Sequence, residues 1–150
     1  MQIFKLLMQK IELPQGYSFV KADEEKDAQR MTEMNNRKDF KHNEVLLRRM
    51  PYALVKQDDN NEPIAFELLD PSGIFRLQYT HPNHRGQGLG NAVERKLARK
   101  ALKLEMIPYK FVEVDNTNVI EASLRCPYWT RWEHNGQSVE INVLKPAGEI

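Results

Sequence analysis

The chain has little cysteine and no long apolar run. Cys126 is the single cysteine among 150 residues, so an intrachain disulfide is excluded and cysteines alone cannot build a zinc site. No apolar stretch approaches the roughly 20 residues that a membrane-spanning helix needs. We therefore expect an intracellular protein, cytoplasmic or mitochondrial, with no metal ligands and no membrane partner.

An excess of charge of either sign is also missing. Lys and Arg total 22 against 21 for Asp and Glu, a net charge of +1, so we expect no nucleic-acid partner. Residues 1–10 are apolar with two lysines, but they lack the cleavage site of a secretory signal, and an organellar presequence stays open. We predict an N-terminal extension over 1–12 and one domain over 13–150.

Turn residues and changes of hydrophobic period predict a mixed α/β fold. Helices are predicted over 23–34, 40–49 and 119–125, and from residue 89 to shortly before Pro108. Strands are predicted over 17–20, 52–55, 63–69, 74–80 and 110–114, followed by a hairpin over 131–144. We expect about seven strands and about four helices, in a sheet that is antiparallel at its ends and parallel in the middle.

The segment from His84 to Gly90 is the strongest functional signal. It reads His-Arg-Gly-Gln-Gly-Leu-Gly and joins the predicted strand 74–80 to the helix that follows. Glycines at alternate positions leave the backbone bare, so a ligand can approach the amide N–H groups. Those groups lie at a helix start, which has unpaired donors and a partial positive charge. The segment therefore predicts a cradle for a phosphate or pyrophosphate.

Two common nucleotide motifs do not fit this loop. A P-loop needs Lys followed by Ser or Thr after its last glycine, and here Gly90 is followed by Asn91. The dinucleotide fingerprint has a wider final spacing and opens a βαβ unit, whereas antiparallel strands are predicted before this loop. The pattern Arg/Gln-x-x-Gly-x-Gly/Ala does fit, as Arg85 to Gly90. A glycine-rich connection without a ligand is the simple alternative.

The loop, its placement and the order of elements resemble the GNAT superfamily of acyl-CoA-dependent N-acyltransferases. More narrowly, residues 13–17, 63–73 and 79–90 resemble the C-terminal acyl-transfer domain of glycine N-acyltransferase-like proteins. The resemblance covers about residues 13 to 144. In that branch the domain follows an N-terminal one of similar size, so we expect a shortened or single-domain relative.

The resemblance implies coenzyme A as the carrier of an acetyl or acyl group and a small amine as the acceptor, such as glycine or another amino acid. It leaves a homodimer open. The implied cofactor contacts come from the glycine loop, the preceding strand and the turn before the short helix. They are Leu77, Tyr79, Thr80, Arg85, Gly86, Gln87, Gly88, Leu89, Gly90, Asn91, Asn116 and Asn118.

The reaction needs a base, because only a neutral amine attacks a thioester. In the glycine-acylating branch this base is a glutamate directly after the turn glycine, where this chain has Ile74. We predict Glu67 as its replacement, since burial in an apolar strand would raise the pKa of its carboxyl. Strand alternation also allows Glu67 to face solvent. His81 and His84 are further candidates, although loop histidines are usually surface residues.

Two other groups complete the predicted chemistry. A main-chain N–H near Tyr79 would polarise the thioester carbonyl. Tyr128 would protonate the leaving thiolate, or would instead pack with Trp129 and Trp132. Because Ile74 cannot accept a proton, the alternative function is a non-catalytic acyl-CoA-binding domain.

Overall fold

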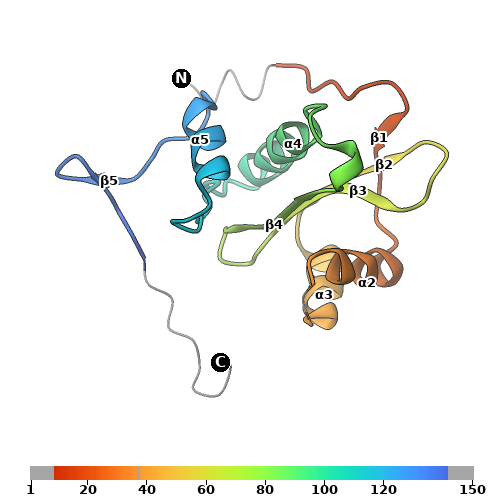
Figure 1. The fold of residues 1–150 in the computed structure, drawn as a ribbon. Coiled ribbons are helices and arrows are strands. Elements are labelled where there is room, and N and C mark those ends of the chain that lie inside the picture. Colours follow the sequence, from red (N-terminus) through yellow and green to blue (C-terminus); the bar gives the residue numbers. More distant parts are fainter. Residues whose placement is uncertain (1–8, 37, 142–150) are drawn as a thin grey trace. The chain divides into compact units, whose positions relative to one another are not determined.

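Four antiparallel strands form the sheet of the first of two compact units (Figure 1). The computed structural model describes residues 9–36 and 38–141, and the two units divide between Phe111 and Val112. The strands run in the order β1 to β4, each paired with its neighbour in the chain. They are β1 Tyr17–Phe19, β2 Tyr52–Gln57, β3 Pro63–Leu69 and β4 Phe75–Thr80.

Helices cover both faces of this sheet (Figure 1). The helices are α2 Glu24–Met34, α3 Phe40–Arg49 and α4 Leu89–Lys103, with the short 3-10 helix η1 Pro82–His84 before α4. Phe66 and Leu68 on β3 pack with Met31 and Leu46 in the core under α2 and α3. Glu67 lies between those two strand residues, so it faces the opposite side, where α4 packs on β3 and β2.

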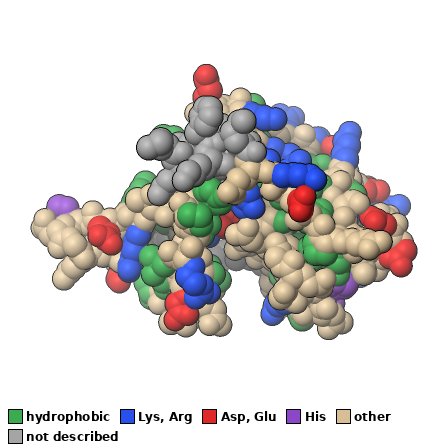
Figure 2. All heavy atoms as spheres, turned by 90° about the horizontal axis from the view of Figure 1, so that it is seen from above, with side chains coloured by type: hydrophobic (Ala, Val, Ile, Leu, Met, Phe, Trp, Pro, Cys, Tyr) green, Lys and Arg blue, Asp and Glu red, His purple; other side chains and the backbone are tan. Residues whose placement is uncertain are grey.

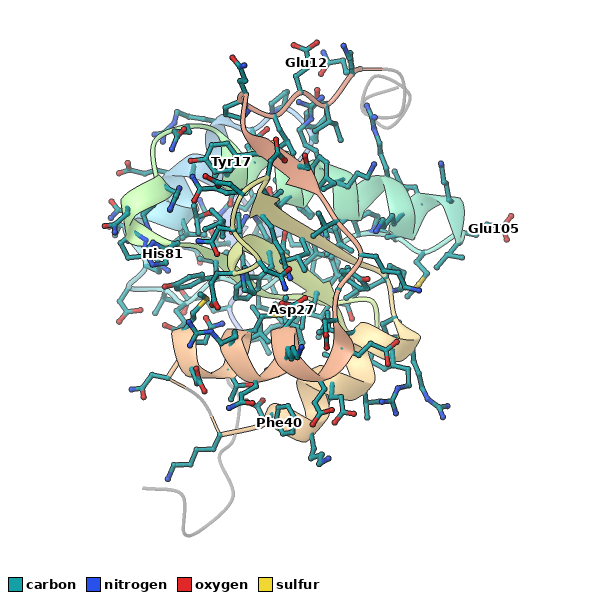
Figure 3. The ribbon with its side chains drawn as sticks, turned by 90° about the vertical axis from the view of Figure 1, so that its right-hand side faces the viewer. Glu12, Tyr17, Asp27, Phe40, His81 and Glu105 are labelled. Atoms are coloured by element: carbon teal, nitrogen blue, oxygen red, sulfur yellow. The ribbon has the colours of Figure 1, made fainter. Side chains whose placement is uncertain are left out.

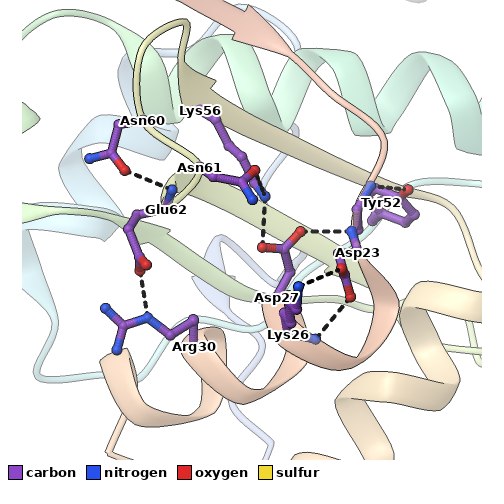
Figure 4. A network of polar contacts seen from close by, with 10 residues as sticks. Asp23, Lys26, Asp27, Arg30, Tyr52, Lys56, Asn60, Asn61 and Glu62 are labelled. Carbon is purple, nitrogen blue, oxygen red and sulfur yellow. Dashed lines mark hydrogen bonds and ion pairs between the residues drawn. The ribbon is translucent and has the colours of Figure 1, made fainter.

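A buried ion pair attaches α2 to the sheet (Figure 4). The Lys56 Nζ on β2 lies 2.8 Å from Oδ1 of Asp27, and both side chains are nearly inaccessible to solvent. Asp27 Oδ2 accepts the Asp23 N–H at 2.8 Å, and Lys56 also donates to Asn61 at 3.1 Å. The charges are thus paired and hydrogen-bonded, which is the condition under which buried charges are tolerated.

Asp23 also caps the N-terminus of α2, because its side chain accepts the Lys26 N–H at 3.1 Å. Replacing Asp23 by Ala should lower the free energy of unfolding by about 1 kcal/mol, since an N–H of the first turn loses its partner. Asp23→Ser keeps a capping oxygen and should retain most of the stability. Urea unfolding of the two variants measures the difference; an equal loss in both would exclude a capping role.

The pairing of β3 with β4 contains a β-bulge. Leu68 pairs with Arg76 and Phe66 with Tyr79, so Glu67 stands opposite two residues of β4. One of the two is Leu77, whose φ of 58° lies in the left-handed region that a leucine seldom adopts. A bulge leaves its extra residue out of the ladder. The main chain of β4 is therefore irregular directly across from Glu67.

The second unit contains α5 Thr117–Arg125 and the short strands β5 Glu133–His134 and β6 Gln137–Ser138. Asn116 caps α5 by accepting the Val119 N–H at 3.4 Å, which confirms the predicted capping turn. The predicted hairpin forms around residues 135 and 136, but its paired strands are shorter than predicted. Residues 142–144 of that hairpin, and 1–8 of the predicted extension, lie outside the described residues.

The prediction of a strand over 110–114 is wrong. Parallel pairing with β4 begins at a single bridge between Ile74 and Tyr109, supported by the Phe75 N–H bonded to the Tyr109 carbonyl at 2.9 Å. It goes no further, because the chain leaves the first unit after Phe111. Within residues 9–36 and 38–141 there are six strands, and all strand pairs are antiparallel. The four predicted α-helices are confirmed. None of the helices in the described ranges has the length and apolar character to cross a bilayer.

Candidate functional site

The glycine loop lies between η1 and α4, as predicted. Gly86 and Gly88 have φ angles of 79° and 78°, a conformation that favours glycine. A Cβ built on either residue meets no atom within 4 Å. Gly90 differs, since its Cβ would lie 3.3 Å from the Thr80 Oγ1. The first two glycines thus keep space open above the loop, and the third lets α4 start close to the end of β4.

The backbone N–H groups of residues 86–91 have no acceptor within the described part of the chain. The Ala92 N–H is the first that bonds into α4, to the Gly88 carbonyl at 3.0 Å. None of the described residues accepts a hydrogen bond from the N–H groups of residues 86–91. Arg85 is an exception among the predicted donors, because its N–H is taken by the Pro82 carbonyl at 3.4 Å. The remaining donors surround space that a Cβ could occupy, and this fits an anion.

Side chains hold the loop in place. The Tyr17 hydroxyl lies 2.7 Å from the His84 Nδ1, and Gln87 donates to that hydroxyl at 3.2 Å. Arg85 Nε donates to the Thr80 carbonyl at 2.9 Å. Figure 3 shows Tyr17 and His81 toward one end of α4 and Glu105 at its other end. Tyr17 on β1 therefore holds the loop through its hydroxyl, a role that the sequence did not indicate.

The side chains of the two loop histidines form hydrogen bonds that stabilise the loop. His84 bonds Tyr17, and the His81 Nδ1 accepts the Asn83 N–H at 3.3 Å. The rings meet edge to face, with their centres 5.4 Å apart. These contacts favour the simpler interpretation of both residues as parts of the loop rather than as bases.

Glu67 is buried, with 1% of its surface exposed, so the solvent-facing alternative is excluded. Its Oε2 has no hydrogen-bond partner among the described residues. Burial raises the pKa of this carboxyl well above its ordinary value of 4.5, and the nearby Glu94 raises the pKa further, while Lys110 lowers it. A carboxyl with these properties keeps its proton to a higher pH than a solvent-exposed carboxyl does.

The raised pKa makes stability depend on pH. Between the ordinary pKa of 4.5 and the raised pKa of Glu67, the folded chain keeps a proton that the unfolded chain has released. The contribution of Glu67 to the free energy of unfolding is therefore full below 4.5 and falls as pH rises through this window. Glu67→Gln cannot ionise, so its stability relative to wild type should increase with pH. Urea unfolding across the window measures this, with the exposed Glu105→Gln as control; a difference that does not change with pH would contradict it.

Glu67 does not occupy the place of the glutamate expected from the glycine-acylating branch. That place is held by Ile74, which forms the bridge to Tyr109. Glu67 stands opposite Leu77 and Gln78, three residues further along β4, or about 10 Å away at the usual rise of a strand. If Glu67 accepts the proton of the amine, this proton transfer would thus take place at the bulge rather than at the start of β4.

The other predicted site residues lie in the second unit. Asn116 uses its side-chain oxygen as the cap of α5, and Asn118 follows in the first turn. Tyr128 is half-buried. Trp132 is 63% exposed. Cys126 is a half-buried free thiol at the end of α5.

Figure 2 shows basic and acidic side chains interspersed on the face in view. Two lysines of α4 contact the sheet or its residues. Lys100 donates to the Tyr52 carbonyl at 2.6 Å, and Lys96 lies over the Phe19 ring at 5.1 Å. These lysines thus pack their stems on the sheet.

Two charged residues of the site were missed from the sequence. Glu94 on α4 and Lys110 form an ion pair of 2.6 Å, and both side chains are nearly buried. Gln78 also donates to the Glu94 Oε2 at 3.3 Å. A signal existed, since Glu94 falls between Val93 and Leu97 on the apolar side of the predicted helix.

The likeness to known proteins is one of fold. No family model matches the chain, and no curated protein matches it. A solved Drosophila protein matches 83% of the chain with a TM-score of 0.71 and 16% identity, and the chain spans 43% of that protein's length. A ribosomal-protein-alanine N-acetyltransferase from Brucella melitensis matches 84% of the chain and 98% of its own length, with a TM-score of 0.52 and 15% identity.

A GCN5-related N-acetyltransferase from Ralstonia eutropha is also similar, at 15% identity and a TM-score of 0.49, over 84% of this chain and 99% of its own. Identities this low speak for the fold and for nothing finer. Together with the helices on both faces of the antiparallel sheet and the loop that opens α4, the likeness identifies the architecture. The chain shares its fold with the solved N-acetyltransferase from Brucella melitensis.

Proposed function

We propose that the chain is an N-acyltransferase that moves an acyl or acetyl group from coenzyme A to the amine of a small molecule. The observation that carries this proposal is the set of acceptor-free N–H groups over residues 86–91, at the start of α4 and beside the end of β4. Such donors suit the diphosphate of coenzyme A. The fold of the solved N-acetyltransferase from Brucella melitensis supports the same reaction class.

The chemistry follows from groups near the bulge. Coenzyme A supplies an activated thioester carbonyl when its acyl form is bound. Main-chain groups of Leu77, Tyr79 and Thr80 would pair with its pantetheine arm as a strand does, and an N–H near Tyr79 would polarise the carbonyl. The amine nitrogen attacks the carbonyl carbon, the new C–N bond forms and the C–S bond breaks. Glu67 takes the proton from the amine.

Three further residues have proposed roles. Tyr128 would return a proton to the leaving thiolate, and Asn116 and Asn118 would contact the cofactor. Glycine or another amino acid remains the proposed acceptor, on the resemblance of residues 63–73 and 79–90 to the glycine-acylating branch. A homodimer, absence of nucleic-acid and membrane partners, and a cytoplasmic or mitochondrial location belong to the same proposal.

The experiment is a matrix of acyl-CoA thioesters against small amines, read by release of free thiol. Thiol release that depends on one amine supports the transferase. A second candidate function, a non-catalytic acyl-CoA-binding domain, is favoured by Ile74 at the place of the usual base. Binding of coenzyme A by calorimetry without thiol release would select it, and no binding would overturn both functions.

A further inference from the structure

The mechanism above leaves a buried ion pair unused. Glu94 and Lys110 meet at 2.6 Å with side chains 8% and 12% exposed. The pair is connected to the surroundings of Glu67, because Gln78, which stands opposite Glu67 on β4, donates to the Glu94 Oε2 at 3.3 Å. A hydrophobic pair of similar volume would often be as stable as a buried ion pair. The charges therefore call for an explanation other than stability.

The surroundings of Glu67 show what the pair acts on. The Oε2 of Glu67 is buried without a partner among the described residues. β2 places Ala53 opposite Glu67, and β4 contributes Gln78, which bonds Glu94 at 3.3 Å. Among the described residues, the charged groups that act on Glu67 are thus Glu94 from α4 and Lys110 from the segment after α4.

We propose that Glu94 and Lys110 are positioning residues that set the proton affinity of Glu67 for the reaction at the bulge. This inference rests on the proposed function of Glu67 as the base. With Glu67 ionised, the three groups carry a net charge of −1 inside the protein. Uptake of the amine proton makes the cluster neutral, which is the favoured state in a medium of low dielectric constant. Glu94 keeps Lys110 from pairing with Glu67, and Lys110 offsets part of the negative charge of the two carboxylates.

The test is the titration of the Glu67 side chain by carbon NMR in the full chain, with Glu67→Gln to assign its signal. Glu94→Gln leaves Lys110 to pair with Glu67, so the titration midpoint should move to lower pH. Lys110→Gln leaves two carboxylates together, so the midpoint should move to higher pH. Glu105→Gln and Lys103→Gln, on exposed residues near the end of α4, are matched controls and should leave it unchanged.

If the ion pair has only a structural role, both variants should be less stable than wild type, and their titration midpoints should not move in opposite directions. Equal midpoints in wild type, Glu94→Gln and Lys110→Gln would overturn the proposal. If either variant fails to fold, Lys110→Arg and Glu94→Asp keep the charges and should restore the wild-type midpoint. The titration needs no substrate, so its failure is distinct from failure of the transferase, which shows as absent thiol release with the titration intact.

Discussion

Gly88→Val is expected to weaken binding of coenzyme A by about 100-fold or more while the chain still folds. Gly88 is the residue before α4 and has a φ of 78°, where a non-glycine residue costs about 1–2 kcal/mol. Its Cβ would stand in the open space above the loop, among the donors predicted to hold the diphosphate. A 100-fold change in affinity represents roughly 2.7 kcal/mol, and we expect it from obstruction of the loop, because the backbone strain is present with and without ligand and lowers the stability of the fold instead. Calorimetry with free coenzyme A measures the loss.

The matched control is Gly136→Val in the hairpin of the second unit. Gly136 has a similar φ of 76°, and its Cβ likewise meets no atom within 4 Å. The control therefore carries the same backbone strain without touching the loop. Equal affinities of the two variants for coenzyme A would show that the loop is not a diphosphate site, and the proposed function would then lose its main support.

Glu67→Gln is expected to reduce turnover by about 100-fold or more with unchanged affinity for coenzyme A. The amide cannot accept the amine proton, and general-base catalysis contributes factors of about 100 to 10,000. Because Gln has nearly the volume of Glu, the packing of α4 on β3 around residue 67 should persist. Steady-state rates with saturating acyl-CoA, together with calorimetry on the same preparation, separate turnover from binding.

A second pair of variants locates the base. Ile74→Glu restores the residue of the glycine-acylating branch at the start of β4. If Glu67 is the base, Ile74→Glu alone should not raise turnover, and the double variant with Glu67→Gln should stay inactive. Recovery of activity in the double variant would place the reaction near Ile74 instead. Glu105→Gln serves as the neutral control.

Local patterns predicted most of the fold but only part of the site. The helices and the first four strands follow from hydrophobic period, capping residues and turn signals, all of which act over a few neighbours. The loop glycines were likewise readable, since alternate glycines before a helix have few other uses. The strand predicted over 110–114 does not form. Alternation of side chains indicates only a propensity for a strand, whereas a strand also needs a partner edge, and here pairing stops at one bridge.

The interior charges were the hardest to predict. Strand alternation left the exposure of Glu67 open, because the sequence does not show that helices cover both faces of β3 and bury all of its residues. Lys110 and Glu94 are separated by the end of α4 and the turn after it, and their pairing depends on the path that the chain takes past Tyr109. Leu77 gave no sign of its left-handed backbone, since bulges are set by the register of two strands together.

The irregular step in β4 makes the strand sensitive to its own length. If Leu77 were deleted, each residue of β3 would have one partner on β4, and the ladder of hydrogen bonds would be regular. The main-chain donors proposed for the thioester would then be paired within the sheet. The pairs of Phe66 with Tyr79 and of Leu68 with Arg76 would be kept. A chain shorter by one residue here would thus gain a regular sheet and lose the irregular main chain opposite Glu67.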